Sequence, residues 1–578
     1  MTQITKAMKL DLEGRGRLTV RPSDYVSAGG EGAVYRSGDI VVKLYADPDK
    51  MRRDGMADKI RLLSSLNHPF VVAPRGVALT GAGEPVGYYM DFVDGEPLPR
   101  LFTNDFRGRT GFGDGDASLL VDRMRQAMQF AHANGAVMVD PNEMNWLADL
   151  GGRDGPQPRV IDVDSWAIGR WSGSVVMLSI RDWQASAFSE ATDWFAWGIV
   201  TFQIYTGIHP YKGKLAGYGA AELERRMRDN ASVFEPGIRL NRAVRDFSAV
   251  PGALLDWYVG VFRDGERTMP PSPFERGGAH KVAAMVPSAA ASAAPGELLI
   301  EKLFGDSGNP VRRVWPCGVV RLESGTLVDL AGPRVIGSMQ SPDGEIVRLE
   351  DGWLIADRAA ETPIFGFVNA TSLQAVPLTL GLQVRQTLRF ENRLFTVTDG
   401  GLAELKLSNL GRPLLSAGQA RGVLPNATRW FDGVGIQDVM GAAYVIAPFG
   451  EDGVAQLRVP ELDGQTPVNA RAGRRFVTVV GIDSAGDYRK TELAINADYR
   501  SYRAWQGEAA GPELNIAILP KGVCATIVED GMLDVFVPAN GKVNRVADGR
   551  IGTDMVLANW DDRVLLLHDC EVWRLRMS

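Results

Sequence analysis

The sequence has few of the residues that build disulfide frameworks and structural zinc sites, and it has no membrane-length apolar segment. Only three cysteines occur among 578 residues, and they are too scattered for a disulfide framework or a zinc site. No run of about 18 apolar residues is present, and the N-terminus lacks the continuous apolar stretch of a signal peptide. These absences predict a cytoplasmic protein with no membrane partner.

The chain also lacks an excess of positive charge. Its 63 Lys and Arg residues are outnumbered by 70 Asp and Glu residues, which gives a formal net charge of -7. Nucleic-acid binding proteins usually carry a basic surface, so no nucleic-acid partner is expected. A hydrophobic content of 45% and a charged content of 23% are ordinary for a globular protein. The length is too great for one core and predicts several domains.

A change of composition divides the chain near its middle. Residues 278–297 are rich in Ala, Ser and Pro and show no sustained period, which is typical of a linker. Before this segment, strand-like and helix-like patterns alternate. After it, short alternating strands separated by Gly, Asp and Asn turns follow one another to the end of the chain. The sequence therefore predicts a mixed α+β domain over residues 1–277 and an all-β domain over residues 298–578.

The second half contains an internal repeat. Residues 392–407 align without gaps on residues 562–577, and each segment reads as strand, turn and strand. Weaker copies recur at spacings of about 30 to 50 residues. This spacing suits four-stranded blades and predicts a six- or seven-bladed β-propeller. No WD or kelch signature is present. A β-sandwich or two small β domains remain open as alternatives, because strand–turn–strand units are common to all β proteins.

The first half contains a set of polar residues at telling positions. Asp140 and Asn145 follow a helix end with the spacing D-x-x-x-x-N, and a later apolar strand ends on Asp162. Two carboxylates and an amide in this order are what phosphoryl transfer requires: one group to orient a hydroxyl and two to bind a metal ion. Taken alone, the first motif is better explained as a turn rich in Asp, Pro and Asn.

A glycine-rich segment lies upstream of these residues. It contains Gly29, Gly30 and Gly32, followed by Val34, and then Lys43 inside the apolar strand IVVKLY. Small residues let backbone N–H groups approach phosphates, and a lysine inside an apolar strand is costly unless an anion meets it. A plain glycine-rich hairpin and a surface strand are the simpler alternatives for each feature by itself.

Taken together, these motifs resemble those of a protein kinase, of an atypical bacterial Ser/Thr kinase-like type, over about residues 20 to 275. The resemblance implies a bilobal α+β fold with an N-lobe over about residues 18–93 and a C-lobe over about residues 94–277. It also implies ATP and Mg²⁺ as cofactors. Lys43 and Asp140 would be catalytic, with Asp140 accepting the proton of the acceptor hydroxyl. Asn145 and Asp162 would bind Mg²⁺.

The resemblance also implies a nucleotide pocket. The three glycines would cover the phosphates and Val34 would cover the adenine. The segment PVGYYMDFVDG reads as a buried strand leading into a connector, as a kinase hinge does. Met90 would then be the gatekeeper, and the backbone of Asp91 and Val93 would meet the adenine edge.

Several positions depart from the kinase pattern. The helix after Lys43 contains no glutamate, and the expected position is occupied by Lys59. Asp58 could substitute after a small shift, or another group could hold Lys43. The His and Arg that usually precede the catalytic Asp are replaced, which predicts no activation through a phosphorylated loop. Asp164 replaces the Gly of D-F-G and is either a second metal contact or a lock on the loop.

Signals later in the first half fit the same resemblance. Asp193 opens an apolar helix and would cap the backbone of the loop before Asp140. Arg267 would pair with an acidic residue of the segment before that helix, where Asp182 and Glu190 are the candidates.

Two functions follow as hypotheses. The first is an ATP- and Mg²⁺-dependent protein Ser/Thr kinase whose β-propeller recruits a protein substrate or partner. The second is a pseudokinase, an interaction scaffold that binds nucleotide without phosphotransfer. The missing helix glutamate favours the scaffold, and retention of Lys43, Asp140, Asn145 and Asp162 favours catalysis. Transfer of another group, such as AMP, on the same fold is not excluded by the sequence.

Overall fold

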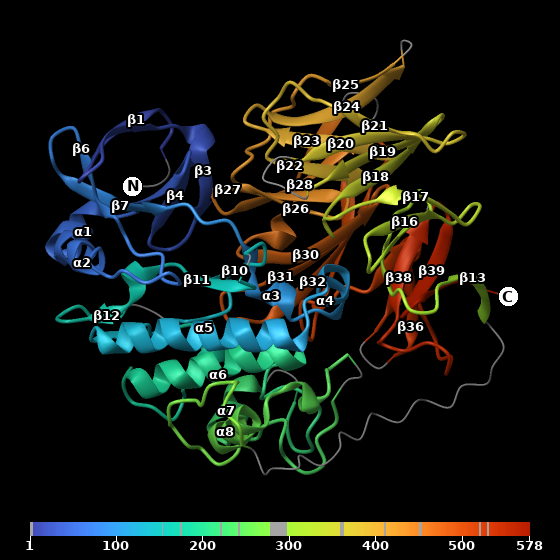
Figure 1. Ribbon diagram of the computed structural model, residues 1–578. Coiled ribbons are helices and arrows are strands. Elements are labelled where there is room, and N and C mark those ends of the chain that lie inside the picture. The colour runs from blue at the N-terminus through green and yellow to red at the C-terminus, as the bar shows by residue number, and fades with distance from the viewer. Residues whose placement is uncertain are drawn as a thin grey trace.

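The computed structural model covers most of the chain, and its N-terminal and C-terminal regions differ in kind. The predicted linker, residues 278–297, lies outside the described residues. The described residues are 4–152, 154–173, 176–219, 222–240, 243–277, 298–358, 363–409, 412–449, 453–519, 522–528 and 531–577. Residues up to 277 form a mixed α and β region, and residues from 298 form an all-β region (Figure 1).

The N-terminal region begins with a seven-stranded sheet. Its order is β2-β1-β6-β7-β5-β4-β3. The strands are β1 (Met8–Leu12), β2 (Gly16–Val20), β3 (Tyr25–Ala28), β4 (Gly32–Ser37), β5 (Ile40–Tyr45), β6 (Gly76–Thr80) and β7 (Pro85–Asp91). Every residue of β5 is buried, as its continuous apolar pattern predicts for a strand inside a sheet. This strand carries Lys43 into the interior.

Two short helices, α1 (Pro48–Arg53) and α2 (Met56–Leu63), cover one face of this sheet. The first begins where Asp47 accepts a hydrogen bond from the amide of Lys50 at 2.9 Å, an ordinary N-cap. The second begins after Gly55, whose φ of 66° allows the chain to turn between the helices. The helices place Lys59 on the side of the sheet that faces Lys43.

The rest of the N-terminal region is mainly helical. Its elements are β8 (Glu96–Pro97), α3 (Leu98–Leu101), α4 (Asn104–Thr110), α5 (Asp114–Ala133), β9 (Ala136–Val137), β10 (Trp146–Asp149), β11 (Gln157–Val160), β12 (Ala167–Ile168), α6 (Glu190–Thr206), α7 (Leu223–Arg228) and α8 (Gly252–Phe262). Helix α6 is buried on all sides from Thr192 to Thr206, as expected of a helix with apolar residues all round. It forms the centre of the core against α5 and α8. None of the helices in the described ranges combines the length and apolarity needed to cross a membrane.

The all-β region contains seven four-stranded antiparallel sheets within the described residues. Six of them are built from consecutive strands: β14 (Val311–Val314) to β17 (Arg334–Ser338), β18 (Glu345–Leu349) to β21 (Ala375–Leu378), β22 (Gln386–Phe390) to β25 (Pro413–Ala417), β26 (Thr428–Phe431) to β29 (Gly453–Arg458), β30 (Thr466–Gly473) to β33 (Tyr502–Glu508), and β34 (Ile516–Ile518) to β37 (Lys542–Val546).

Their inner members are β15 (Val319–Leu322), β16 (Thr326–Asp329), β19 (Gly352–Asp357), β20 (Ile364–Asn369), β23 (Arg393–Thr398), β24 (Gly401–Asn409), β27 (Val434–Val439), β28 (Ala442–Phe449), β31 (Phe476–Ile482), β32 (Tyr488–Ile495), β35 (Cys524–Ile527) and β36 (Leu533–Val537). The repeated segments predicted from the sequence are β23–β24 and the pair β39 (Arg563–His568) and β40 (Glu571–Met577). Each pair forms the two inner strands of its sheet.

The seventh sheet joins the two ends of the region. Strand β13 (Leu298–Gly305) pairs with the last strand, β40 (Glu571–Met577), which also pairs with β39 (Arg563–His568), and β38 (Val556–Trp560) completes the sheet. In Figure 1 the last strands, in red, lie beside the first strands of the region, in yellow-green.

Each sheet packs against the next one through a cluster of buried apolar residues. Such clusters join the β14–β17 sheet to the β18–β21 sheet and continue, sheet by sheet, to the sheet that contains β40. A further cluster joins that last sheet back to the β14–β17 sheet, with Leu565 and Leu567 packed against Val320 and Leu322. The order of the sheets in space therefore follows their order in the chain.

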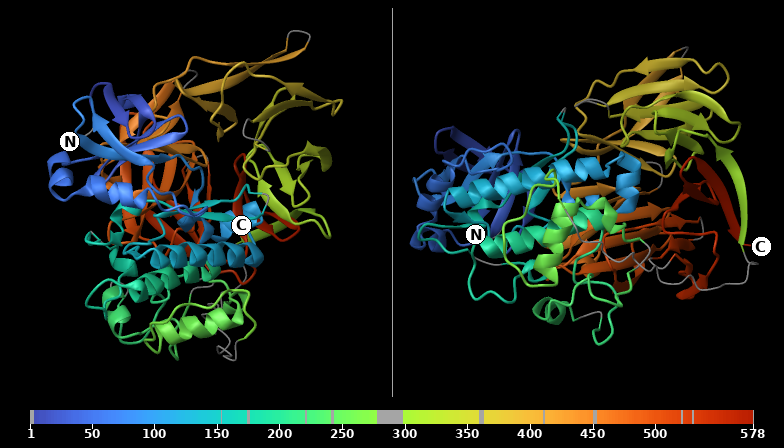
Figure 2. Two further views of the ribbon diagram at one scale, coloured as in Figure 1. Left: turned by 60° about the vertical axis from the view of Figure 1, so that its left-hand side comes forward. Right: turned by 60° about the horizontal axis from the view of Figure 1, so that its bottom comes forward.

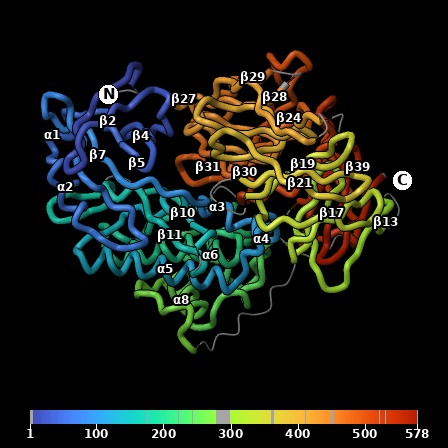
Figure 3. The backbone as a smooth tube through the Cα atoms, turned by 45° about the horizontal axis from the view of Figure 1, so that its top comes forward, coloured from blue at the N-terminus to red at the C-terminus, as the bar shows by residue number. Residues whose placement is uncertain are grey.

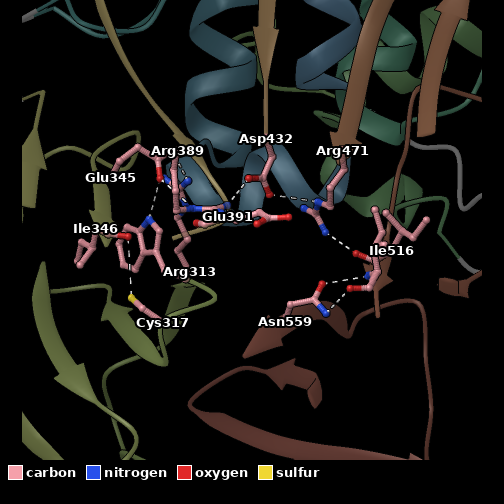
Figure 4. A network of polar contacts seen from close by, with 12 residues as sticks. Arg313, Cys317, Glu345, Ile346, Arg389, Glu391, Asp432, Arg471, Ile516 and Asn559 are labelled. Atoms are coloured by element: carbon pink, nitrogen blue, oxygen red, sulfur yellow. Dashed lines mark hydrogen bonds and ion pairs between the residues drawn. The ribbon is translucent and has the colours of Figure 1, made fainter. Parts of the chain in front are cut away.

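Polar residues near the starts of the sheets are joined in one network (Figure 4). Arg313 lies 2.8 Å from Glu345, Glu345 lies 3.5 Å from Arg389, and Arg389 pairs with Asp432. Asp432 lies 3.3 Å from Arg471, which donates to the carbonyl of Ile516 at 2.6 Å. Burial opposes ionisation of Asp432, but Arg389 and Arg471 outweigh it and lower the pKa of Asp432 to about 2.

The two regions share a long junction, visible in the views of Figures 2 and 3. Ala427 of the all-β region packs into the cluster on the far face of the N-terminal sheet. Tyr25 donates a hydrogen bond to Asp438 at 2.9 Å, and Asp105 of α4 lies 3.8 Å from Arg471 of the polar network. The composition of the sequence predicts the division into two regions but gives no sign of this junction.

Candidate functional site

Lys43 and two aspartates form the centre of the candidate site. The Nζ of Lys43 donates to Asp162 Oδ1 at 2.7 Å and to both carboxylate oxygens of Asp164 at 2.9 Å. Glu31 lies 3.7 Å away. Burial opposes the charge of Lys43, but Asp164 and Asp162 outweigh it and raise the pKa of Lys43. The lysine is therefore a cation held by carboxylates in the interior.

Asp164 is the most completely bonded member of this group. Besides Lys43, its carboxylate accepts the hydroxyl of Tyr45 at 2.6 Å and that of Tyr88 at 2.7 Å, and its carbonyl oxygen accepts Lys59 Nζ at 2.6 Å. Although burial disfavours its charge, Lys43 and the two tyrosines lower the pKa of Asp164. Asp164 is thus an ionised anchor between the sheet and helix α2.

Asp162 differs from Asp164 in both exposure and backbone conformation. Its side chain is 35% exposed, and its φ of 60° lies in the left-handed region. Burial and the neighbouring charge of Asp164 raise the pKa of Asp162. Aspartate tolerates left-handed backbone better than most residues, and such conformations often occur at functional sites. The turn directs one carboxylate oxygen of Asp162 at Lys43 and leaves the second oxygen available to a ligand.

The structure resolves the alternatives for the partner of Lys43. Asp58, one sequence-based candidate, is exposed and lies 3.0 Å from Arg61 and 3.7 Å from Arg170. Asp164 holds Lys43 instead. Lys59, which stands at the expected glutamate position, is buried, and its Nζ donates to the backbone carbonyl of Asp164.

Asp193 holds the loop that carries Asp140 through hydrogen bonds to its backbone. The carboxylate of Asp193 accepts the amides of Met138 at 2.7 Å and Val139 at 2.9 Å, and it lies 2.8 Å from His132 Nε2. Val139 has a φ of 70°, which is unfavourable for a β-branched residue and is stabilised by these bonds. The predicted capping role of Asp193 is confirmed.

Asp140 and Asn145 lie at the two ends of this loop and contact each other. Asn145 Nδ2 donates to the carbonyl of Asp140 at 2.9 Å, so the side-chain oxygen of Asn145 faces away from that bond. Asp140 Oδ1 accepts the amide of Met177 at 2.9 Å. Burial raises the pKa of Asp140, with the Met177 bond acting in the opposite direction.

The two halves of the site are joined through the backbone. The carbonyl of Asn145 accepts the amide of Ile161 at 2.9 Å, and Ile161 directly precedes Asp162. Strands β10 and β11 continue this pairing, with Trp146 opposite Val160. The predicted metal ligands Asn145 and Asp162 are therefore neighbours at the open end of one hairpin.

The glycine-rich segment forms the turn between β3 and β4. Gly29 donates to the carbonyl of Gly32 at 2.9 Å. A Cβ at Gly32 would lie 2.3 Å from the carbonyl oxygen of Leu44, so packing inside the sheet requires glycine there. A Cβ at Gly29 or Gly30 would meet nothing within 4 Å. Steric contacts within the protein therefore do not explain these two glycines, and close approach of a ligand would.

The remaining predicted nucleotide residues lie on strands next to Lys43. Val34 is opposite Lys43 in the β4–β5 pairing, and Met90 is opposite Val41 in the β5–β7 pairing. Asp91 ends β7, where its side chain lies 2.5 Å from Arg75. Val93 follows β7 and is partly buried.

The late motif of the N-terminal region forms the predicted ion pair. Arg267 donates to Asp182 at 2.6 and 3.0 Å. Asp182 is therefore the acidic partner of Arg267, and Glu190 lies elsewhere, 3.9 Å from His132.

Glu143 is a buried acid that sequence reasoning did not single out. It lies in the loop between Asp140 and Asn145, with 2% of its surface exposed, and its Oε2 has no hydrogen-bond partner among the described residues. Burial raises the pKa of Glu143 to about 7.

Two comparisons with known proteins found no match. No protein-family model matches this chain, and no curated protein matches it. Within the described part of the chain, no group of three or more His, Cys, Asp or Glu side chains is placed to hold a metal ion. A cation would have to be held by fewer carboxylates, with an amide or a ligand completing its coordination.

Proposed function

We propose that the N-terminal region is a protein kinase-like domain that binds ATP with Mg²⁺ and transfers the γ-phosphoryl group to a Ser or Thr hydroxyl of a protein. The supporting observation is the hydrogen bond between Asn145 and Ile161, which places the Asp140–Asn145 pair next to Asp162 and, through it, Lys43. Phosphoryl transfer needs these groups together because catalysis consists mainly of positioning and charge stabilisation.

The residues present suit a magnesium-bound nucleotide. Asp162 has an oxygen beyond the one bound by Lys43, and Asn145 has a side-chain oxygen directed away from Asp140, and such oxygen atoms are the ligands that Mg²⁺ prefers. When bound, Mg²⁺ would supply charge neutralisation on the phosphates. The open backbone at Gly29 and Gly30 would cover them, and Met90, Asp91, Val93 and Val34 would contact the adenine.

The roles of the chain's own residues follow from their positions. Lys43 would bind phosphate oxygens, exchanging part of its bonding with Asp162 and Asp164 for the ligand. Asp140 would orient the acceptor hydroxyl and accept its proton through the carboxylate oxygen that Met177 does not occupy. Asp193 would hold the loop in place during this exchange.

We further infer that the all-β region is a closed seven-bladed β-propeller that recruits a protein substrate or partner. Support comes from the seven four-stranded sheets, the pairing of β13 with β40, and the apolar cluster between the last and first sheets. In a closed ring every sheet packs between two neighbours, only short edges stay unpaired, and the loops form a rigid binding surface. The polar network through successive first strands fits a ring axis.

A pseudokinase scaffold is the second candidate. It is favoured by the saturation of Lys43, which two aspartates already bind, and by the occupation of Asp140 by the amide of Met177. In this case nucleotide binding would set the shape of the molecule without transfer.

Incubation with Mg²⁺ and labelled ATP, followed by mass analysis of the protein and of added acceptor proteins, tests the proposal. Phosphate addition by the wild type, lost in Asp140→Asn and retained in Asp11→Asn, would support kinase activity. Asp11 is an exposed carboxylate on β1. Nucleotide binding without any mass addition would support the scaffold. Addition of AMP would contradict both candidates and indicate AMP transfer. Equal labelling by wild type and Asp140→Asn would exclude Asp140 as the catalytic group.

A further inference from the structure

One turn of the all-β region reaches the candidate site. It comprises residues 483–487, between β31 and β32, and Figure 3 shows β31 beside β10 at the junction of the regions. The turn is internally braced: Asp483 Oδ1 accepts the amides of Ala485 and Asp487, each at 3.0 Å. The amide of Gly486 donates to the carbonyl of Asp483 at 3.0 Å. The turn is therefore a preformed element rather than a loose loop.

The tip of this turn presses on residues 177–180. Gly486 is buried and has a φ of 87°. A Cβ at Gly486 would lie 2.1 Å from Ser179 Oγ and 3.1 Å from Met177 Sδ. Glycine is thus required twice at this position, once by the backbone conformation and once by the contact.

The contacted segment is held from its other side as well. His209 is buried, and its Nε2 lies 2.8 Å from the carbonyl oxygen of Ser179. Ser179 is therefore buried between His209 of the N-terminal region and the β31–β32 turn, whereas Leu178 beside it is exposed.

The same segment covers Asp140. The amide of Met177 donates to Asp140 Oδ1 at 2.9 Å, so one oxygen of the proposed catalytic carboxylate is occupied by the segment that the turn restrains. The path of contacts from the all-β region to Asp140 consists of Gly486, the 177–180 segment and one hydrogen bond.

Residues next to the turn strengthen the junction. Tyr488, the first residue of β32, belongs to a buried cluster against which Met144 packs, and Met144 lies between Asp140 and Asn145 in the catalytic loop. Lys212 lies 3.9 Å from Asp487, with its Nζ 5.6 Å from the ring centre of Tyr488. The hairpin thus contacts three separate segments of the N-terminal region.

We propose that the β31–β32 turn is an autoinhibitory clamp that holds residues 177–180 over Asp140 and restricts access of an acceptor hydroxyl to that carboxylate. Withdrawal of the turn frees the segment and opens the acceptor side. The role of Asp140 rests on the proposed function, whereas the restraint on its accessibility does not.

The substitution Gly486→Val tests the clamp, because the added side chain cannot occupy the contact with Ser179. Gly441→Val is the matched control: Gly441 lies in the turn between β27 and β28 with a φ of 79°, and a Cβ there would meet nothing within 4 Å. Both variants strain a left-handed turn, but only one removes the contact. Asp483→Ala is a second variant, which loosens the turn without added bulk in case Gly486→Val does not fold.

Two readouts report on the segment without requiring catalysis. Carbodiimide coupling of an amine to carboxylates, followed by peptide mass analysis, measures the accessibility of Asp140. Hydrogen–deuterium exchange measures the protection of the Met177 amide. We expect several-fold faster modification of Asp140 and faster exchange at Met177 in Gly486→Val and Asp483→Ala than in the wild type or Gly441→Val. Unchanged rates in folded Gly486→Val or Asp483→Ala would overturn the clamp.

Phosphate transfer from ATP is measured on the same proteins. An increase in Gly486→Val supports the inhibitory direction, and a decrease with an exposed Asp140 overturns it, since the turn would then be an activating support. If no variant transfers phosphate while the accessibility of Asp140 still rises, the clamp stands as a structural restraint and the proposed kinase function fails.

Discussion

Lys43 donates hydrogen bonds to both carboxylate oxygens of Asp164, each at 2.9 Å, although the two residues are 121 positions apart in the chain. This pair joins β5, an interior strand of the N-terminal sheet, to the segment that follows β11. It also explains how a lysine is tolerated inside an apolar strand, because the buried charge has a buried partner.

Asp164→Asn should strongly destabilise the N-terminal region. The substitution leaves Lys43 in the interior with Asp162 as its main counter-charge, and breaking one side of a buried ion pair costs about 3–5 kcal/mol. Denaturant unfolding of the variant should start at lower concentration than that of the wild type. Asp58→Asn is the matched control, because Asp58 is exposed and its loss should change little. Equal stability of the two variants would contradict the anchoring role of Asp164.

Asp162→Asn should remove the magnesium-dependent part of nucleotide binding. At a hundredfold excess over Kd, a ligand stabilises the folded state by about 2.7 kcal/mol, which appears as a rise in melting temperature. The wild type should show a larger shift with ATP and Mg²⁺ than with ATP and a chelator, and the variant should show the same shift in both. If no nucleotide raised the melting temperature of the wild type, the ATP site would be ruled out.

Glu143 should make stability fall as pH rises. Its folded-state pKa of about 7 lies above the ordinary value of 4.5, so the folded protein binds more protons than the unfolded chain between these values. The free energy of unfolding should therefore decrease from about pH 4.5 to about pH 7, by an amount on the order of 3 kcal/mol, and level off above.

The substitution Glu143→Gln should flatten that part of the pH profile, while Glu84→Gln, at an exposed site, should leave it as in the wild type. Denaturant titrations at several pH values provide the measurement. Subtracting the Glu143→Gln profile from the wild-type profile removes the contribution of the other groups. If the remaining free energy of unfolding rose between pH 4.5 and pH 7, the buried protonated state of Glu143 would be contradicted.

Arg389→Met should destabilise the all-β region. Arg389 is 8% exposed and lies between Glu345 and Asp432, so its removal leaves two partly buried carboxylates without their shared cation, at a cost of about 3–5 kcal/mol. Arg545→Met is the control, since Arg545 of outer strand β37, which pairs with Asp534 of β36, is about half exposed. Unfolding followed by tryptophan fluorescence distinguishes them, and similar midpoints would argue against a structural role for the network.

Removal of residues 571–578 should unfold or aggregate the all-β region. Strand β40 lies between β13 and β39, and its loss leaves both with unpaired edges and removes Val572 and Leu575 from two buried clusters. Arg576→Ala, at an exposed position of the same strand, should leave the fold intact. A truncated protein that remains soluble with an unchanged melting profile would contradict ring closure by β40.

Local patterns of the sequence determined much of the N-terminal fold. The apolar run around Lys43 is a buried strand, Asp193 caps the loop before Asp140, and Arg267 pairs with Asp182. In the second half, the aligned segments 392–407 and 562–577 occupy equivalent inner strands. These features are readable because periodicity, capping and turn residues act over a few positions of the chain.

Tertiary structure decided which groups meet across long separations. From the sequence, two roles were open for Asp164, and Asp58 was a candidate partner for Lys43. Only the packing of the folded chain shows that Asp164 is the partner of Lys43. The contact of Gly486 with Ser179 brings together segments more than 300 residues apart in the chain. No local period encodes such contacts, because they arise from the shape complementarity of two folded regions rather than from the conformational preferences of either segment.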